Sequence, residues 1–298
     1  MELRHLRYFI TVAEELHFTR AAERLHIAQP PLSQQIQALE AELGVTLFLR
    51  EKRKVALTAA GQQFLLRARR ILADTADAAE QARRAARGEI GELRIGFTSS
   101  LPLTPILPAA LHAYRQHYPA VRLTLREMFI TDQFTALLEQ DIDVGFVRFN
   151  GPSPIDSITV KELRRDTLLA VVNSRHPLAS ASQLTMEQLR DEGLICYPRS
   201  AGTGLHVVIR QLCQANGFEP RINQEAGEAT TQVGLVAAGL GIAILPSPLA
   251  CVQLPGVRYI PLTDEAAYLA MGIATRTVDS SPLVQGFVAH LWDEVEIG

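Results

Sequence analysis

The most informative part of the chain covers residues 18–44, FTRAAERLHIAQPPLSQQIQALEAELG. Its first part predicts a short helix over residues 20–25, where the Thr19 hydroxyl can cap the N-terminus by accepting a bond from a free backbone N–H. After a tight turn, Pro30 or Pro31 suits the first turn of a second helix, because a missing N–H is no loss there. This pair of short helices predicts a helix-turn-helix.

The second of these helices, which is expected to end at Gly44, has two unlike faces. Its apolar face holds Leu32, Ile36, Leu39 and Leu43. Its other face carries uncharged hydrogen-bonding side chains, Gln29, Ser33, Gln34 and Gln37. Amides and hydroxyls can pair with base edges in the major groove or with phosphate oxygens. We therefore expect a DNA-recognition helix, and a merely polar surface is the alternative when the helix is considered alone.

A short hairpin is predicted next, with strands at residues 47–50 and 55–58. The basic side chains on or beside its tip are Arg50, Lys52, Arg53 and Lys54. Such cations neutralise DNA phosphates whatever the base sequence, and salt weakens the attraction. A charged tip by itself is usually only solvated. Directly after two short helices it predicts the wing of a winged helix-turn-helix.

Residues 58–87 contain no proline and predict one long helix. Small and apolar residues recur in steps of four and three, as in a heptad seam, at Phe64, Ala68, Ile71, Thr75, Ala78 and Ala82. About thirty residues at ~1.5 Å each give a helix of roughly 45 Å, too weakly apolar to be stable alone in water. We expect two such helices to pair in a dimer, and a partner within the same chain is the alternative.

Several runs in this region carry a family resemblance. LRHLRYF (residues 3–9), FTRAA (18–22), QPPLSQQI (29–36) and LTAAG (57–61) resemble the LysR-type transcriptional regulators. The match covers the whole N-terminal domain. In this family the position of Gln34 is very often arginine, so the chain departs from the family pattern at that point.

The resemblance implies three segments with separate roles. Residues 1–58 would form a winged helix-turn-helix DNA-binding domain, residues 59–90 a linker and dimerisation helix with a hinge, and residues 91–298 an effector-binding domain. The candidate DNA-binding residues are Thr19, Gln29, Pro30, Pro31, Ser33, Gln34, Gln37, Arg50, Arg53 and Lys54.

Beyond residue 90, strand-like runs alternate with helical ones, which predicts a mostly parallel α/β sheet. The final strand and helix return to the first set of elements. The simplest arrangement is two lobes joined by crossing strands, as in periplasmic binding proteins. Lobe I would cover about 91–161 and 266–298, and lobe II about 162–265. The family resemblance implies the same fold for the effector domain.

Two loops that follow strands are candidate ligand sites, because ligands of open α/β sheets lie beyond the carboxyl ends of the strands. One is Thr98-Ser99-Ser100 and the other runs from Ser200 to Gly204. Hydroxyls and free N–H groups at a helix N-terminus favour an anion such as a carboxylate, although ordinary helix capping explains each loop taken separately. The candidate effector-binding residues are Thr98, Ser99, Ser100, Leu101, Thr131, Phe146, Arg148, Thr203, Gly204, Leu205 and Glu228.

Two further runs, DVGFVR (143–148) and EAGE (225–228), resemble the branch of the family that controls aromatic-compound catabolism. Its inducers include benzoate-like and muconate-like acids, which implies an aromatic or dicarboxylic acid as effector. Arg148 could pair with Glu228 across the cleft or bind the effector itself. Relatives commonly place a small hydroxyl residue one position before Thr131, so either Thr131 makes that contact here or the effector is less polar on that side.

The composition fits this division of roles. Residues 1–90 carry 14 Lys and Arg against 11 Asp and Glu, whereas the rest of the chain has 15 against 21, for a net charge of −3 overall. Basic character is therefore confined to the predicted DNA-binding end. Hydrophobic residues make up 47% and charged residues 20%, as in an ordinary folded protein.

Other classes of protein lack support in the sequence. No G-x-S-x-G, phosphate-loop or H-E-x-x-H motif is present and the eight histidines are dispersed, so we expect no catalysis, cofactor or metal site. The three cysteines, Cys196, Cys213 and Cys251, form no C-x-x-C pair. A redox-sensing regulator of the same family and a cytoplasmic solute-binding protein are the alternatives.

Location and partners follow from the same features. No signal peptide or membrane span is predicted, so we expect a cytoplasmic protein. The expected partners are double-stranded promoter DNA, a small effector and further copies of the chain in a dimer or tetramer. RNA polymerase is a further candidate partner.

Overall fold

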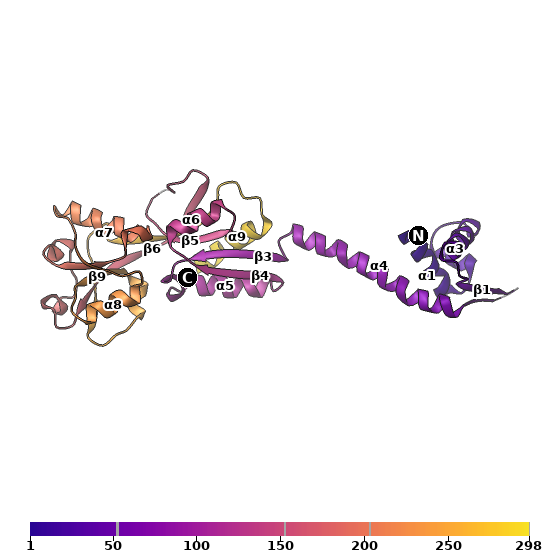
Figure 1. Ribbon diagram of the computed structural model, residues 1–298, viewed down its shortest axis with the longest axis horizontal. Coiled ribbons are helices and arrows are strands. Elements are labelled where there is room, and N and C mark those ends of the chain that lie inside the picture. Colours follow the sequence, from indigo (N-terminus) through magenta and orange to yellow (C-terminus); the bar gives the residue numbers. More distant parts are fainter. Residues whose placement is uncertain (52–53, 152, 203, 298) are drawn as a thin grey trace. The chain divides into compact units, whose positions relative to one another are not determined.

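The computed structural model divides into two compact units, Met1–Arg84 and Ala85–Gly298, each with its own hydrophobic core (Figure 1). It describes residues 1–297 apart from 52, 53, 152 and 203.

The N-terminal unit is the predicted winged helix-turn-helix followed by the long helix. Its elements are α1 (Leu3–Glu15), α2 (Phe18–Arg24), α3 (Gln29–Leu43), β1 (Phe48–Glu51), β2 (Lys54–Leu57) and α4 (Ala59–Ala86). β1 and β2 pair in an antiparallel hairpin. The predicted fold of this part of the chain is confirmed.

The ends of the two short helices confirm one sequence prediction and correct another. Proline stands in the first turn of α3, and Gly44 ends this helix with a φ of 69°. The cap of α2, however, is His17, whose ring accepts a bond from the Arg20 N–H. Thr19 already lies in the first turn of α2, because the helix begins at Phe18, two residues earlier than predicted. The prediction that Thr19 caps this helix is therefore wrong.

Phe9 lies at the centre of the N-terminal core. Its ring packs 5.2 Å from that of Phe48 in the wing and 4.9 Å from that of Phe64 at the start of α4, measured between ring centroids. Gly61 lets α4 approach the wing closely, since a side chain there would overlap the Leu47 carbonyl oxygen. The first turns of α4 are thus part of the DNA-binding unit.

This packing corrects the predicted seam along α4. Phe64 is half-buried against the core and Ala68 is fully buried in it, so both contact their own chain. The seam residues that are exposed in this chain lie farther along the helix, and they are Ile71, Thr75, Ala78 and Ala82. Association of two chains along this shorter stretch stays a prediction.

The C-terminal unit contains one large mixed sheet with helices on its faces. Its strands are β3 (Gly91–Phe97), β4 (Val121–Glu127), β5 (Val144–Arg148), β6 (Ile158–Asn173), β7 (Gly193–Cys196), β8 (Arg221–Glu225), β9 (Ile242–Pro246), β10 (Val257–Pro261) and β11 (Tyr268–Arg276). Its helices are α5 (Ile106–His117), α6 (Ile130–Leu138), α7 (Gly204–Ala215), α8 (Ala229–Ala237) and α9 (Pro282–Ile297), with short 3₁₀ turns between them.

The strand order explains the two lobes. It runs β4-β3-β5-β11-β6-β9-β7-β8, with β10 paired to β6. The outer strands β3, β4 and β5 are mutually parallel, as are β7, β8 and β9, whereas β6 and β11 run antiparallel to their neighbours. The long β6 and β11 connect the two halves of the sheet, which confirms the expected crossing strands.

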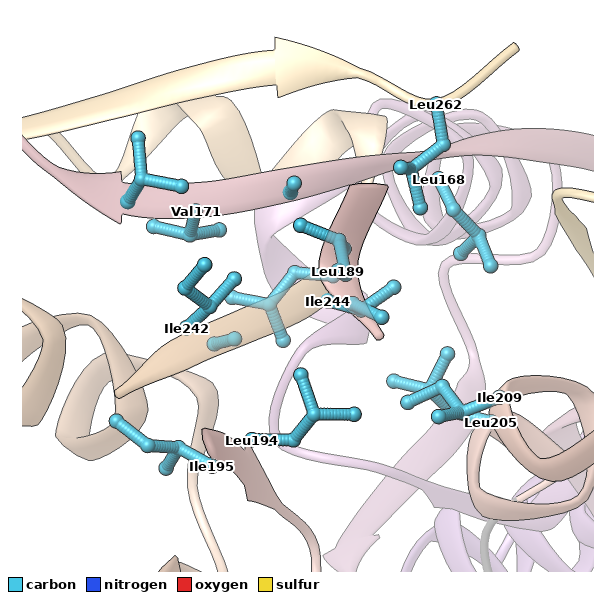
Figure 2. Packing of buried hydrophobic residues seen from close by; sticks show 14 of the residues in the cluster. Leu168, Val171, Leu189, Leu194, Ile195, Leu205, Ile209, Ile242, Ile244 and Leu262 are labelled. Carbon is cyan, nitrogen blue, oxygen red and sulfur yellow. The ribbon is translucent and has the colours of Figure 1, made fainter. Parts of the chain in front are cut away.

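Each half has its own apolar core. In lobe II, Leu168 and Val171 of β6 belong to one apolar cluster with Ile242 and Ile244 of β9 and Ile209 of α7 (Figure 2). All of β9 is buried, as expected for a strand whose two faces are both covered. Burying one such side chain stabilises the fold by about 1.5–3 kcal/mol. These cores fix the strand ends from which the candidate site is built.

Candidate functional site

The predicted recognition face of α3 is open to solvent. Among its residues only Ser33 is half-buried, and the exposed ones are Gln29, Pro30, Pro31, Gln34 and Gln37. Thr19 of α2 is also exposed. The structure thus leaves a row of amides and hydroxyls available along one side of the unit, as direct contact with DNA requires.

Arg50 at the edge of the wing is held in place by its neighbours. Its guanidinium donates to the Glu40 carboxylate at 3.0 Å and lies over the Phe18 ring, 4.9 Å from the centroid. One nitrogen also approaches the Ser33 hydroxyl at 3.4 Å. Arg50 therefore connects the wing to the recognition helix.

The same glutamate fixes the start of the wing. One oxygen of Glu40 accepts the backbone N–H groups of Leu47 and Phe48, at 2.8 and 3.0 Å. Lys54 is exposed on β2. Lys52 and Arg53 lie outside the described residues. The roles of these basic side chains toward phosphates stay predictions.

A cleft of about 350 Å³ lies in the C-terminal unit, where the carboxyl ends of β3, β4, β5, β7 and β9 meet. This is the position expected for a ligand of an open α/β sheet. The lining residues are Thr98, Ser99, Ser100, Glu127, Met128, Phe129, Ile130, Asp132, Arg148, Tyr197, Leu205, Gly227, Glu228, Pro246, Leu249 and Leu269. Six of the predicted effector residues are among them, namely Thr98, Ser99, Ser100, Arg148, Leu205 and Glu228.

Arg148 is the buried cation of this cleft. Only 6% of its side chain is exposed, and its Nη1 donates to Asp166 at 2.6 Å. Its Nε and Nη2 are buried without a hydrogen-bond partner. Buried polar groups are rarely left unsatisfied, because each one costs about 1–3 kcal/mol. Arg148 thus lines the cleft with two donors that no group in the described part of the protein satisfies.

Asp166 is the counter-charge beneath Arg148. Its side chain is fully buried on β6, and Arg164 lies 2.8 Å from its other oxygen. Met271 of β11 stands between Arg148 and Arg164 in the sheet register. Of the two alternatives for Arg148, pairing with Glu228 is not what the structure has, because the Arg148 guanidinium contacts Asp166 on the crossing strand instead.

Hydroxyl groups line the same cleft as this cation. The buried Ser100 and the half-buried Thr98 approach each other at 3.5 Å between their hydroxyl oxygens. Burial and the nearby Glu228 raise the pKa of Tyr197 to about 12, while Arg148 acts in the opposite direction. The Tyr197 phenol therefore stays protonated at neutral pH and can donate a hydrogen bond into the cleft.

Two predicted effector residues lie in the core of lobe I and line no part of the cleft. Leu101 is fully buried there, and Phe146 packs against Phe287 of α9 at 6.2 Å between ring centroids. Phe146 has this position because successive side chains of β5 point to opposite faces at each step, and every residue of the strand is buried. Those two predictions are wrong.

The loop before α7 also differs from the prediction. Thr131 is exposed and packs toward Gly202, while its neighbour Ile130 lines the cleft. Gly204 lies against the backbone of Arg148, where a side chain would overlap the carbonyl oxygen. Thr203 lies outside the described residues. In this segment only Leu205 lines the cleft, so neither Thr131 nor Gly204 is among its lining residues.

Two family descriptions match the chain and together cover most of it. "Bacterial regulatory helix-turn-helix protein, lysR family" matches residues 3–62, and "LysR substrate binding domain" matches residues 86–296. The chain belongs to the LysR family of transcriptional regulators. It is thus a DNA-binding regulator with an effector-binding domain, and not an enzyme.

Individual relatives match along the full chain. The uncharacterized HTH-type transcriptional regulator YnfL of Escherichia coli (strain K12) is 45% identical over 98% of this chain and 98% of its own. The regulator BenM of Acinetobacter baylyi (strain ATCC 33305 / BD413 / ADP1) is 39% identical over 95% and 93%. The crystal structure of full-length CbnR with its target DNA has a TM-score of 0.83 at 32% identity, covering 99% of this chain and 100% of that one.

In this LysR-family regulator, sequence reasoning missed four polar residues of the site, Asp166, Tyr197, Glu127 and Asp132. A signal for Asp166 existed, because it is a charged residue two positions before the apolar run that begins at Leu168 of β6. Glu127 ends β4 and Asp132 stands in the first turn of α6, and no sequence period shows that these two element ends meet at one cleft.

Cysteine chemistry is disfavoured by the structure. Burial raises the pKa of Cys196 to about 11 and that of Cys213 to about 12, so both remain thiols at neutral pH. Cys251 is exposed.

Within the described ranges, no helix has the length and apolar character needed to cross a membrane.

Proposed function

We propose that this regulator binds a small effector bearing a carboxylate in the cleft, and that the effector changes how the protein binds promoter DNA. The observation that supports this most directly is the pair of unpartnered donors on the buried Arg148. A guanidinium with two free N–H groups matches the two oxygens of a carboxylate. Ser100 and Tyr197 would supply further hydrogen bonds to the same group.

The apolar part of the lining suits the rest of such a molecule. Met128, Phe129, Leu205, Leu249 and Leu269 surround the cleft from both lobes. The resemblance to the branch that controls aromatic-compound catabolism makes benzoate-like and muconate-like acids the first compounds to test.

The effector would act by favouring one arrangement of the two lobes. Arg148 belongs to lobe I, whereas Leu205 and Glu228 belong to lobe II, so a bound molecule contacts both. Its influence on DNA binding is limited to the difference between its affinities for the two arrangements. We further propose that the exposed stretch of α4 pairs two chains, and that such dimers, alone or as tetramers, hold two operator half-sites.

The test is binding of aromatic and aliphatic carboxylic acids to the purified full-length protein by isothermal titration calorimetry. Arg148→Lys keeps a cation for Asp166 but cannot present two parallel donors in the plane of a carboxylate, so we expect at least a tenfold loss of affinity, about the value of a charged hydrogen bond. Arg258→Lys is the matched control, because Arg258 is exposed on β10 and lines no part of the cleft. Equal affinity of the two variants for every acid would refute the proposal.

A further inference from the structure

The cleft carries more acid than base. Three carboxylates line it, those of Glu127, Asp132 and Glu228, against the single cation of Arg148. No hydrogen bond or ion pair joins any of these three carboxylates to another side chain in the described part of the molecule. Asp143, by contrast, is paired with Arg94. The three lining carboxylates are therefore available to a ligand.

The positive charge of Arg148 is already balanced by a carboxylate of the protein. Asp166 contacts it at 2.6 Å and is itself fully buried, with Arg164 on its other side. A ligand with two carboxylates could place one on the free donors of Arg148, but its second would face the remaining acids without a counter-cation. Like charges repel, most strongly near the half-buried Glu228, whereas Glu127 and Asp132 are exposed. The cleft thus favours a ligand with one carboxylate over the muconate-like dianions that the family resemblance implies.

The cation and one of these acids share the cleft with a phenol. Arg148, Glu228 and Tyr197 all line it, Arg148 from β5 in lobe I and the other two from lobe II. Glu228 is half-buried at the N-cap position of α8, yet its carboxylate makes no capping bond to the helix. Its carboxylate is therefore unbonded within the fold, at the positive end of the α8 dipole.

We propose that the effector is a zwitterion of the amino-acid type, with its carboxylate on Arg148, its ammonium group toward Glu228 and its side chain among Met128, Leu205 and Leu249. This inference rests on the proposed function and narrows it. The ammonium group of the ligand would pair with the carboxylate of Glu228, and its carboxylate would accept hydrogen bonds from the two spare donors of Arg148. The apolar lining selects a ligand with an aliphatic or aromatic side chain.

The first experiment measures the unfolding temperature of the full-length protein with each of the twenty proteinogenic amino acids at millimolar concentration. The most stabilising one is then compared, by titration calorimetry, with three analogues of the same skeleton. One lacks the amino group, one lacks the carboxylate, and one is the malonate in which a second carboxylate replaces the amino group. We expect the amino acid to bind about tenfold more tightly than each analogue.

Two variants separate the possible outcomes. Glu228→Gln is expected to abolish the preference for the amino acid over the malonate, whereas Glu265→Gln, at an exposed acid that does not line the cleft, keeps it. The inference is overturned if no amino acid stabilises the protein, or if the malonate or the deaminated acid binds as tightly as the amino acid. If deaminated acids bind as tightly and their binding still depends on Arg148, the proposed carboxylate site is retained and only the proposal of a zwitterionic effector is refuted.

Discussion

Replacing Asp166 with asparagine removes the charge on which two guanidinium groups depend. The amide is nearly the same size as the carboxylate and can still accept one bond, so the change is electrostatic and not steric. Arg148, with 6% of its side chain exposed, then loses its ion pair with Asp166. Arg164, with 38% exposed, can turn toward solvent.

The expected loss in the free energy of unfolding follows from this difference in exposure between the two arginines. Breaking a buried ion pair by removing one partner costs about 3–5 kcal/mol, and we take the lower end, ~3 kcal/mol, because the amide keeps a hydrogen bond. For a unit of this size, ~1 kcal/mol lowers the unfolding temperature by about 2–4 °C. We therefore expect Asp166→Asn to unfold roughly 6–12 °C below the parent protein.

Thermal unfolding followed by circular dichroism measures this shift. Glu187→Gln is the control, because it breaks an ion pair with Arg190 that is exposed on both sides and is expected to change the unfolding temperature little. A bound carboxylate would replace part of the lost charge, so benzoate should stabilise Asp166→Asn more than the parent. Unfolding of Asp166→Asn at the parent temperature would refute this account of the site.

Three further predictions concern other parts of the chain. Gly61→Ala forces a side chain onto the Leu47 carbonyl oxygen and is expected to destabilise the DNA-binding unit by about 1–3 kcal/mol or more, measurable by urea unfolding. Burial would raise the pKa of Asp143, but its bonds to Arg94 hold it below the usual 3.8, so this carboxylate stabilises the fold at neutral pH and the contribution is lost as pH falls through the lowered pKa. The stability difference between the parent and Asp143→Asn should accordingly shrink in acid, and a constant difference across the pH range would contradict the assignment. Arg50→Ala should weaken binding to all DNA sequences alike and reduce the salt slope by about one unit, as a titration at several salt concentrations would show.

Much of the fold could be predicted because its signals are local. The two prolines at the start of α3, Gly44 at its end and the basic hairpin each act within a few residues, and the structure has all three. The cap of α2 could not be assigned with the same certainty, since His17 and Thr19 stand two positions apart and helix ends are poorly defined by sequence. The burial of Phe64 depends on contacts with Phe9 that no helical period reveals.

The candidate site was predictable only in part. The loop at Thr98 and the cation at Arg148 follow strands directly, and the rule that ligands lie at carboxyl ends of strands places both in the cleft. The partner of Arg148 could not be derived in this way, because Asp166 reaches it across β11 from a strand that crosses between the lobes. Pairings across a sheet need the strand order, and one sequence does not supply it.

The most direct test of ligand-controlled DNA binding is the affinity of the full-length protein for the DNA upstream of its own gene, measured by fluorescence anisotropy over a salt series with and without the tightest-binding carboxylate. We expect specific binding that weakens with salt, that the ligand alters in the parent protein, and that the ligand leaves unchanged in Arg148→Lys. The claim that this cleft controls the regulator would be contradicted if saturating the cleft with ligand changed neither the affinity of the protein for DNA nor the length of DNA that it protects.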